Sequence, residues 1–217
     1  MRKTIAILDY GAGNLTSIRL AFEHLGAAPF VTGDAAEAAR ADALVFPGVG
    51  SAKSGMEGLL ARGLDHAVRG AVAAGRPVLA ICLGMQMCCD RSEEDGGVDG
   101  LGLVPGTVRL FRFDGDAAPD GRRPKVPHMG WNAIALRQTR HPVFAGLDGE
   151  AFYFVHSYFA EADGPGRAAT TEYGGLAFAS ALAAGSLVAT QFHPERSGEA
   201  GLALLGNFLA WEGSPCC

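Results

Sequence analysis

The N-terminal part of the chain alternates short apolar runs with longer segments in which apolar residues recur at helical spacing. Short apolar runs bounded by turn residues are typical of buried strands, whereas apolar residues three or four positions apart are typical of amphipathic helices. Strands that alternate with helices in this way predict a parallel sheet with right-handed crossovers. The expected strands are 4–8, 29–31, 43–46 and 77–81, and the expected helices are 15–25, 35–40 (capped by Asp34) and 55–73.

Beyond Gly102 the pattern changes to strand-like segments, and helical spacing returns only near the C-terminus. Residues 114–124 are polar and contain several turn formers, which predicts a loop or a small insertion. The chain shows neither an internal repeat nor a linker, so we expect a single domain of the α/β class over residues 1–217. The expected later strands are 107–113, 133–137, 151–155, 175–179 and 187–191, and the expected last helix is 199–211.

The apolar run 77–81 ends abruptly at Cys82, and a helix-like segment begins directly after it. A strand, a sharp turn and a helix in this order are typical of a nucleophile elbow, here with cysteine where a hydrolase often has serine. A thiol at a helix N-terminus lies in a field that favours the thiolate. The alternative is a buried core cysteine, which is the commonest fate of a free cysteine. Gly84 supports the elbow, because glycine allows the tight turn.

A histidine and a carboxylate follow the last expected strand. His193 and Glu195 are two positions apart, so on an extended strand end their side chains project from the same face. A carboxylate beside an imidazole can fix its tautomer and stabilise its charged form. By itself this pair is more typical of a surface His-Pro turn with a solvated Glu195. Together with the elbow at Cys82, it predicts a Cys-His-Glu triad for covalent catalysis.

Three of the expected loops follow parallel strands and should therefore lie at one edge of the sheet. They are residues 9–14, 47–50 and 82–84. The glycine-rich turn 47–50 can aim backbone N–H groups at a developing oxyanion, and the N–H of Leu83 is a second candidate donor. Gly11 and Gly13 hint at a dinucleotide fingerprint, but Thr16 occupies the third small position. We expect no cofactor.

Composition limits the classes of partner. The net charge of −5 argues against binding to nucleic acid or to an anionic membrane surface. The chain contains no apolar run near the roughly 20 residues that span a bilayer, and we expect a cytoplasmic protein. The five cysteines form neither a disulfide pattern nor a zinc-ligand spacing, so we expect no metal site. Cys88 and Cys89 are interpreted as small core residues.

Taken together, the motifs resemble the triad-type class I glutamine amidotransferase domains. More specifically, the chain resembles the family of glutaminase subunits of imidazole glycerol phosphate synthase, an enzyme of histidine biosynthesis. The elbow alone would not separate subfamilies, whereas PHMGWN and YFVHSY do. The motifs are DYGAGN (9–14), PGVG (47–50), ICLGMQ (81–86), PHMGWN (127–132), YFVHSY (153–158) and QFHPERS (191–197).

The resemblance implies a three-layer, flavodoxin-like fold, with a mostly parallel sheet flanked by helices and additional antiparallel strands in the second half. It implies that the Cys82 thiolate attacks the side-chain amide of glutamine and that His193, oriented by Glu195, passes a proton to the departing ammonia. Ammonia then travels to a separate cyclase subunit of (βα)8-barrel type, in a heterodimer that makes imidazole glycerol phosphate and aminoimidazole carboxamide ribotide.

The resemblance also assigns residues around the triad. The backbone at Val49, Gly50 and Leu83 would hold the oxyanion, and Gln86 would lie by the bound glutamine. Two residues depart from the family pattern. Ala80 replaces a glycine of the elbow, and Arg196 replaces a lysine after the triad glutamate, where the two side chains are not interchangeable. The residues expected near the partner surface are Trp131, Asn132, Tyr158 and Arg196.

Three other readings stay open at this point. Another amidotransferase of the same fold would keep the triad but should lack PHMGWN and YFVHSY. A stand-alone cysteine hydrolase of small amides should turn over quickly without a partner. A flavodoxin-like binding domain with an incidental cysteine would keep its properties when Cys82 is replaced by serine.

Overall fold

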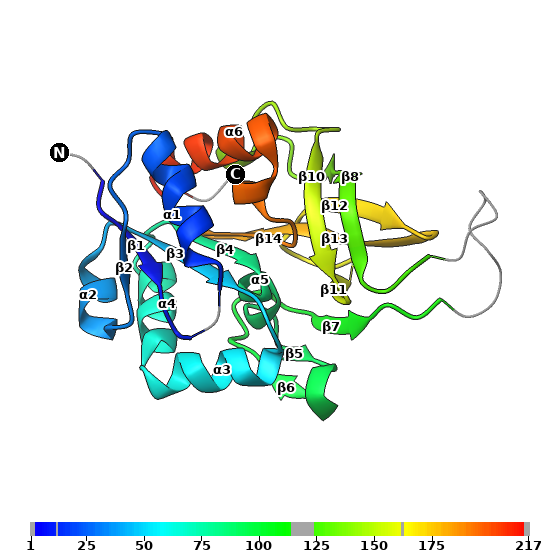
Figure 1. Cartoon of the computed structure of the whole chain (residues 1–217), viewed down its shortest axis with the longest axis horizontal. Helices are drawn as coiled ribbons and strands as arrows, with labels where there is room; N and C mark the ends of the chain where they lie inside the picture. The colour runs from blue at the N-terminus through cyan, green and yellow to red at the C-terminus, as the bar shows by residue number, and fades with distance from the viewer. Residues whose placement is uncertain (1–2, 12, 114–123, 162, 215–217) are drawn as a thin grey trace.

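A mixed β-sheet runs through the centre of the molecule, with helices on both of its faces (Figure 1). This computed structural model describes residues 3–11, 13–113, 124–161 and 163–214. The expected loop 114–124, apart from its last residue, and the terminal pair Cys216 and Cys217 lie outside the described residues. The strand order is β2-β1-β3-β4-β14-β13-β11-β7-β5-β6, and β12 pairs with both β13 and β9.

One half of the sheet is parallel, and its strands are buried apart from the edge strand β2. Its strands are β1 (Ile5–Leu8), β2 (Phe30–Thr32), β3 (Ala43–Gly48), β4 (Val78–Cys82) and β14 (Leu187–Thr190). In β1, Ile5 and Ile7 pack into one hydrophobic core, whereas Ala6 and Leu8 pack into the other. Successive side chains of a strand point to opposite faces, so a parallel strand covered on both sides needs a continuous apolar run.

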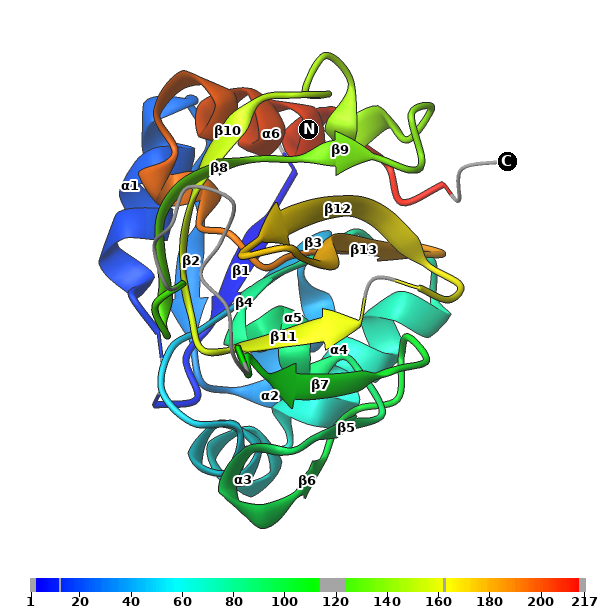
Figure 2. The ribbon, with the colours of Figure 1, turned by 90° about the vertical axis from the view of Figure 1, so that its right-hand side faces the viewer.

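The helices divide between the two faces (Figures 1 and 2). On one face lie α1 (Leu15–His24) and α6 (Gly198–Ala210). On the other lie α2 (Ala35–Arg40), α3 (Ala52–Ala61), α4 (Leu64–Ala73) and α5 (Leu83–Met87). Asp34 caps α2 as predicted, because its side chain accepts hydrogen bonds from two backbone N–H groups of the first turn.

The second half of the sheet is mostly antiparallel, as expected. A separate ribbon of β8 and β10 packs Phe152 and Phe154 into the same core as α1 and α6. Short 3-10 turns are η1 (Glu94–Gly96), η2 (Pro142–Phe144) and η3 (Pro194–Arg196). The strands are β5 (Arg91–Ser92), β6 (Val98–Asp99), β7 (Thr107–Leu110), β8 (His128–Ala133), β9 (Ala135–Leu136), β10 (Ala151–His156), β11 (Tyr158–Glu161), β12 (Arg167–Tyr173) and β13 (Leu176–Ala184).

The predicted helix 55–73 is wrong as a single element. The chain forms α3 and α4 instead, and Gly63 separates them with φ 64°, which is a left-handed conformation that glycine adopts without steric cost. The predicted strand 107–113 ends earlier, at Leu110, and the predicted strand 175–179 continues to Ala184. The strands β8 and β12 were not predicted, because their polar residues and Gly130 hide the alternation of a strand.

Candidate active site

Cys82 lies at the sharp junction between β4 and α5. Its backbone has φ 55° and ψ −110°, a conformation that side-chain-bearing residues rarely adopt and that is typical of a nucleophile elbow. Gly84 packs so closely on β3 that an added side chain would collide with the carbonyl oxygen of Phe46. The junction therefore places the sulfur at the carboxyl edge of the parallel strands, where the three expected loops converge.

The alanine that replaces the family glycine fits the elbow. Ala80 is fully buried, and in the sheet register it lies opposite Phe46 of β3 and Ala189 of β14. Its methyl group contributes to the hydrophobic core that contains these two neighbours. The elbow at Cys82 forms with this methyl group in place.

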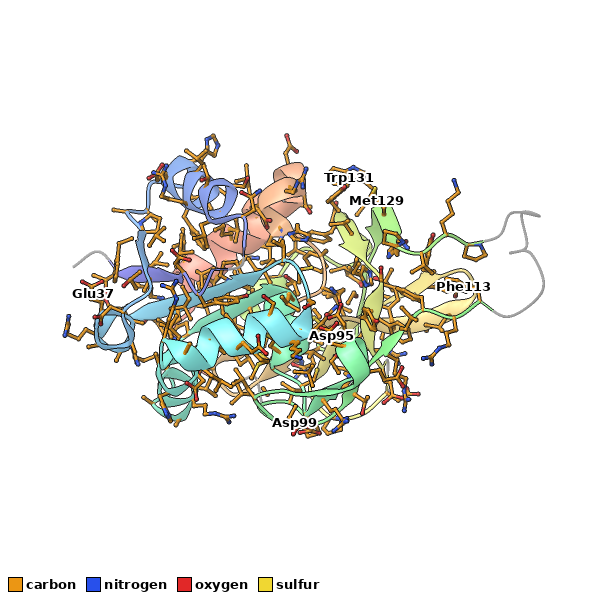
Figure 3. All side chains as sticks on the ribbon, turned by 60° about the horizontal axis from the view of Figure 1, so that its bottom comes forward. Glu37, Asp95, Asp99, Phe113, Met129 and Trp131 are labelled. Atoms are coloured by element: carbon orange, nitrogen blue, oxygen red, sulfur yellow. The ribbon has the colours of Figure 1, made fainter. Side chains whose placement is uncertain are left out.

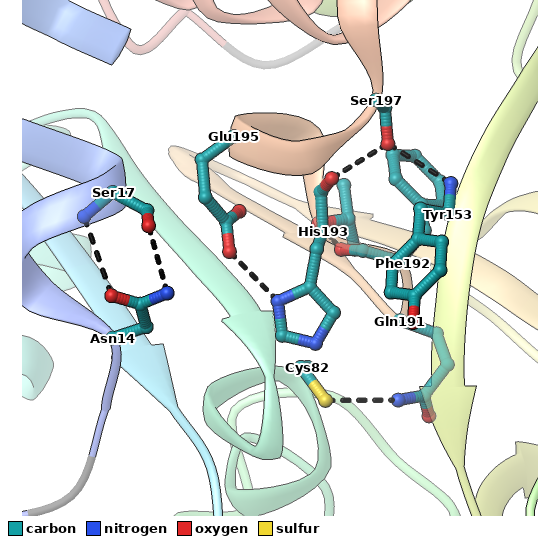
Figure 4. Close-up of polar contacts among 10 residues, drawn as sticks. Asn14, Ser17, Cys82, Tyr153, Gln191, Phe192, His193, Glu195 and Ser197 are labelled. Atoms are coloured by element: carbon teal, nitrogen blue, oxygen red, sulfur yellow. Dashed lines mark hydrogen bonds and ion pairs between the residues drawn. The ribbon is translucent and has the colours of Figure 1, made fainter. Parts of the chain in front are cut away.

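His193 and Glu195 contact each other directly. The imidazole Nδ1 lies 2.8 Å from the carboxylate Oε1, and the two side chains are 5% and 4% exposed. The predicted strand end is wrong, since β14 ends at Thr190 and His193 caps the 3-10 turn η3 that carries Glu195. The 3-10 turn brings His193 and Glu195 into the contact that an extended strand end was expected to provide. Figure 4 shows the ring of His193 between Glu195 and the sulfur of Cys82.

The surroundings of His193 favour its charged form. Burial lowers the pKa of His193, but the neighbouring Cys82 and Glu195, the latter hydrogen-bonded to Nδ1, outweigh burial and raise this pKa to about 10. With Nδ1 facing the carboxylate, the Nε2 side of the ring faces the sulfur. The three groups therefore form an arrangement in which a proton can pass between sulfur and imidazole while the carboxylate stabilises the resulting charge.

A cavity of about 410 Å³ opens above the sulfur. It contains Cys82 and His193 together with all the residues expected to hold the oxyanion and the substrate. Val49 is 44% exposed at its mouth. The lining residues are Val49, Gly50, Cys82, Leu83, Gln86, Glu94, Pro127, Val155, His156, Ser157, Tyr158 and His193.

Glu94 is a lining residue that sequence reasoning missed. It lies in η1, between β5 and β6, and its Oε2 accepts a hydrogen bond of 2.7 Å from the backbone N–H of Ala52. Burial raises the pKa of this carboxyl group, and the bond from Ala52 opposes that effect. The run SEEDGG around it resembles any solvated acidic turn, so the sequence held no signal for a site residue here.

Gln86 is buried in α5 and its side-chain amide is held at two points. Its Nε2 donates to the carbonyl oxygen of Tyr158 at 2.9 Å and to Oε1 of Gln191 at 3.0 Å. Both amide hydrogens are used in this way, so the amide oxygen is the group left to face the cavity.

The residues expected at a partner surface lie in three different settings. Trp131 is 58% exposed on β8, and its ring meets the ring of Tyr153 edge to face at 6.3 Å. The guanidinium of Arg196 lies 5.1 Å from the centre of the same tyrosine ring. Asn132 instead turns toward the body of the protein and donates to the carbonyl oxygen of Glu172 at 2.9 Å. The remaining residue, Tyr158, lines the cavity.

Within the described residues, no group of three or more His, Cys, Asp or Glu side chains is arranged to hold a metal ion. Over the same residues, none of the helices combines the length and the apolar character needed to cross a bilayer. Cys88 and Cys89 are fully buried core residues, as predicted.

The fold is shared with solved structures of other proteins. A crystal structure described as a glutamine amidotransferase superposes with a TM-score of 0.71 at 18% identity, covering 95% of this chain and 98% of that one. The structure of PurLQS from Thermotoga maritima superposes with a TM-score of 0.69 at 16% identity, covering 97% of this chain and 99% of that one. At these identities the likeness shows the fold alone.

Sequence comparisons reach further than the fold. Residues 6–211 match the family described as glutamine amidotransferase class-I. The chain is 48% identical over 215 residues to imidazole glycerol phosphate synthase subunit HisH 1 of Pseudomonas aeruginosa, covering 98% of this chain and 99% of that protein. It is 49% identical over 211 residues to subunit HisH of Aromatoleum aromaticum, covering 95% and 98% of the two chains. The chain therefore belongs to the class-I glutamine amidotransferase family and, within it, to the family of HisH subunits.

Proposed function

We propose that this protein hydrolyses glutamine to glutamate and ammonia through Cys82, His193 and Glu195, and that it supplies the ammonia to a synthase subunit of histidine biosynthesis. The observation that carries the proposal is the ordered line of carboxylate, imidazole and sulfur at the floor of a cavity. Membership of the HisH family supports both the reaction and its place in the synthase.

In the proposed reaction, the Cys82 sulfur attacks the side-chain carbonyl carbon of glutamine. The C–N bond breaks, His193 gives its Nε2 proton to the departing nitrogen, and ammonia leaves behind a γ-glutamyl thioester. A water molecule then attacks the thioester carbon while His193 accepts one of its protons. The C–S bond breaks, glutamate leaves, and the sulfur recovers its initial state. Glu195 keeps its charge throughout and holds the imidazole by Nδ1.

The other cavity residues divide the tasks of binding. Backbone N–H groups at Val49–Gly50 and Leu83 stabilise the negative charge on the tetrahedral oxygen. Gln86 offers its amide oxygen to an N–H group of the substrate, since both of its own amide hydrogens are engaged. The Glu94 carboxylate at the cavity wall suits the positively charged α-amino group of glutamine.

The partner proposed for the ammonia is a cyclase subunit of (βα)8-barrel type, bound as a heterodimer. Trp131 and Met129 project outward from β8 (Figure 3), and both are more than half exposed. Tyr153 and Arg196 extend this surface on β10 and η3. Exposed tryptophan, tyrosine and arginine side chains are the residues that most often dominate the binding energy of an interface.

The hydrolysis is tested by measuring glutamate release from the purified chain, alone and with the cyclase subunit and its nucleotide ligand. We expect weak activity alone, strong activity in the complex, and none with Cys82→Ala. Cys88→Ala is the matched control, since Cys88 is a buried cysteine outside the cavity, and it should keep the wild-type rate. Unchanged hydrolysis by Cys82→Ala would overturn the proposal.

The partner surface is tested by titrating the cyclase subunit into wild-type protein and Trp131→Ala, with isothermal titration calorimetry as the readout. An exposed aromatic anchor of an interface should cost about 2 kcal/mol or more, which weakens the Kd roughly 30-fold. Leu60→Ala, which removes an exposed side chain from α3, is the control and should bind normally. Equal binding by both variants would place the interface elsewhere.

A further inference from the structure

Gln191 is a buried side chain that the proposed reaction does not use. It follows the end of β14 and is fully shielded from solvent. Its Nε2 lies 3.8 Å from the sulfur of Cys82, within hydrogen-bonding range for a sulfur acceptor (Figure 4). The amide is therefore in contact with the atom that reacts.

The direction of this amide is set by its surroundings. The carbonyl oxygen of Tyr158 can only accept hydrogen bonds, so the amide of Gln86 must point its Nε2 toward it. The second hydrogen of that Nε2 is donated to Gln191, which must therefore present its oxygen to Gln86. The Nε2 of Gln191 is then the end that faces Cys82. The backbone carbonyl of Tyr158 thus determines that Gln191 presents its N–H donor, and not its oxygen, to the sulfur of Cys82.

A second side chain, His156, contacts the same carbonyl oxygen and begins a further chain of hydrogen bonds. His156 Nδ1 lies 2.8 Å from the oxygen of Tyr158, so this nitrogen carries the proton. The Nε2 of His156 then accepts from His128 Nδ1 at 3.0 Å, and the Nε2 of His128 faces Asn132 Nδ2 at 3.4 Å. Both histidines are buried, which keeps the bond between them away from water.

We propose that Gln191 is a further catalytic residue, which donates a hydrogen bond to the Cys82 thiolate and is held in that direction by Gln86 and the Tyr158 carbonyl. A donor directed at sulfur stabilises the thiolate relative to the thiol. The role of this bond in glutamine hydrolysis rests on the function proposed above. Its effect on the sulfur itself does not, because thiolate formation needs no substrate.

The test is the rate of Cys82 alkylation by iodoacetamide as a function of pH, followed by mass spectrometry of the peptide that carries Cys82. Gln191→Glu places a carboxylate beside the sulfur and should raise the pH midpoint of alkylation by more than 1 pH unit. Gln191→Met keeps the length of the side chain without a donor and should raise it by about 1 pH unit. Gln86→Met frees the amide of Gln191 to turn, and it should raise the pH midpoint of alkylation by less than Gln191→Met does.

Thr190→Val is the matched control. Thr190 is the neighbouring buried polar residue, and its hydroxyl donates to the carbonyl oxygen of Phe192 at 3.0 Å instead of approaching the sulfur. This variant should keep the wild-type midpoint. Circular dichroism checks that each variant folds. If Gln191→Glu does not fold, the alkylation midpoint of Gln191→Met decides whether Gln191 donates to the sulfur.

The outcomes separate the two proposals. Alkylation of Gln191→Met at the wild-type midpoint would overturn the role of Gln191, whether or not glutamine is hydrolysed. A raised midpoint in a protein whose wild type releases no glutamate, even with the cyclase subunit, would support the role of Gln191 at the sulfur and overturn the proposed hydrolysis. In an active protein, Gln191→Met should lower kcat about tenfold and leave KM nearly unchanged.

Discussion

Two buried histidines in the same cavity behave in opposite ways. His193 and His156 both line the space above Cys82, and both are at most 5% exposed. The pKa of His193 is raised to about 10, whereas the pKa of His156 is lowered to about 3. Burial lowers both values, so burial cannot account for the difference.

The difference lies in the partners of each ring. His193 has a carboxylate on one side and the cysteine sulfur on the other, and both favour the charged imidazole. Burial is the largest influence on His156, and its partners are the carbonyl oxygen of Tyr158 and a second histidine, His128. A ring with a carboxylate can store a proton, whereas a ring between a carbonyl and another imidazole serves as a fixed, neutral hydrogen-bonding group.

Removing the charge of Glu195 should have the largest effect. Glu195→Gln keeps the size of the side chain but loses the charge that stabilises the imidazolium, so we expect glutamine hydrolysis to fall by a factor on the order of 10³ to 10⁴. The same substitution should lower the pKa of His193. The measurement is kcat for glutamate release in the complex, together with its pH profile. Glu172→Gln, an exposed carboxylate on β12, is the control, and similar losses in both variants would remove the special role of Glu195.

The pH dependence of stability should have opposite signs at the two rings. A folded pKa above the unfolded value of about 6.5 makes the His193 contribution complete below pH 6.5, and this contribution is lost as the pH rises toward 10. The lowered pKa of His156 makes its contribution complete above pH 6.5, and this contribution is lost as the pH falls toward 3.

Urea unfolding at several pH values measures both effects. Between pH 7 and pH 5, the free energy of unfolding of the wild type should fall by about 2 kcal/mol more than that of His156→Asn. Between pH 7 and pH 9, the wild type should lose more stability than Glu195→Gln. Parallel pH profiles for wild type and both variants would contradict the contrast between the rings.

Paired substitutions at His156 should separate its hydrogen bond from its shape. Asparagine can replace the Nδ1 donor toward Tyr158, whereas phenylalanine fills the space without a donor. We expect His156→Phe to lower kcat/KM for glutamine about tenfold and His156→Asn to lower it by about threefold. A loss in His156→Asn as large as in His156→Phe would show that the ring acts by packing alone.

The smallest effect is expected at a third buried histidine, His141. Burial lowers its pKa too, but its Nδ1 accepts from the backbone N–H of Val143, and it lies outside the cavity. His141→Asn preserves an acceptor at this turn, so hydrolysis should stay within about twofold and stability within about 1 kcal/mol. A large loss of hydrolysis would mean that burial of a histidine, irrespective of its partners, matters for the reaction.

The contrast between these rings also shows what the sequence could and could not predict. The parallel strands were predictable, because a strand covered on both faces must be continuously apolar, and the elbow at Cys82 follows directly from one of them. His193 and Glu195 were predicted as partners, although by a strand and not by the turn that joins them. The prediction that they lie close together still holds, because residues two positions apart are near each other both on a strand and in a 3-10 turn.

The residues that were missed depend on pairings between distant segments. Glu94 reaches the cavity because η1 folds back beside α3. The amide of Gln191 lies between Gln86 and Cys82, which are separated from it by more than 100 residues along the chain. Hydrophobic periodicity reports which face of an element is buried, and it carries no information about the partner of a buried amide.

The position of β14 has a consequence for synthesis of the protein. This strand lies between β4, its parallel neighbour, and β13, its antiparallel neighbour, and it is the last strand of the sheet in chain order. Until β14 has been synthesised, the edges of β4 and β13 that face it therefore lack their partner strand. Truncated or stalled products should consequently aggregate and should not consume glutamine, because the strand that closes the sheet also leads into His193.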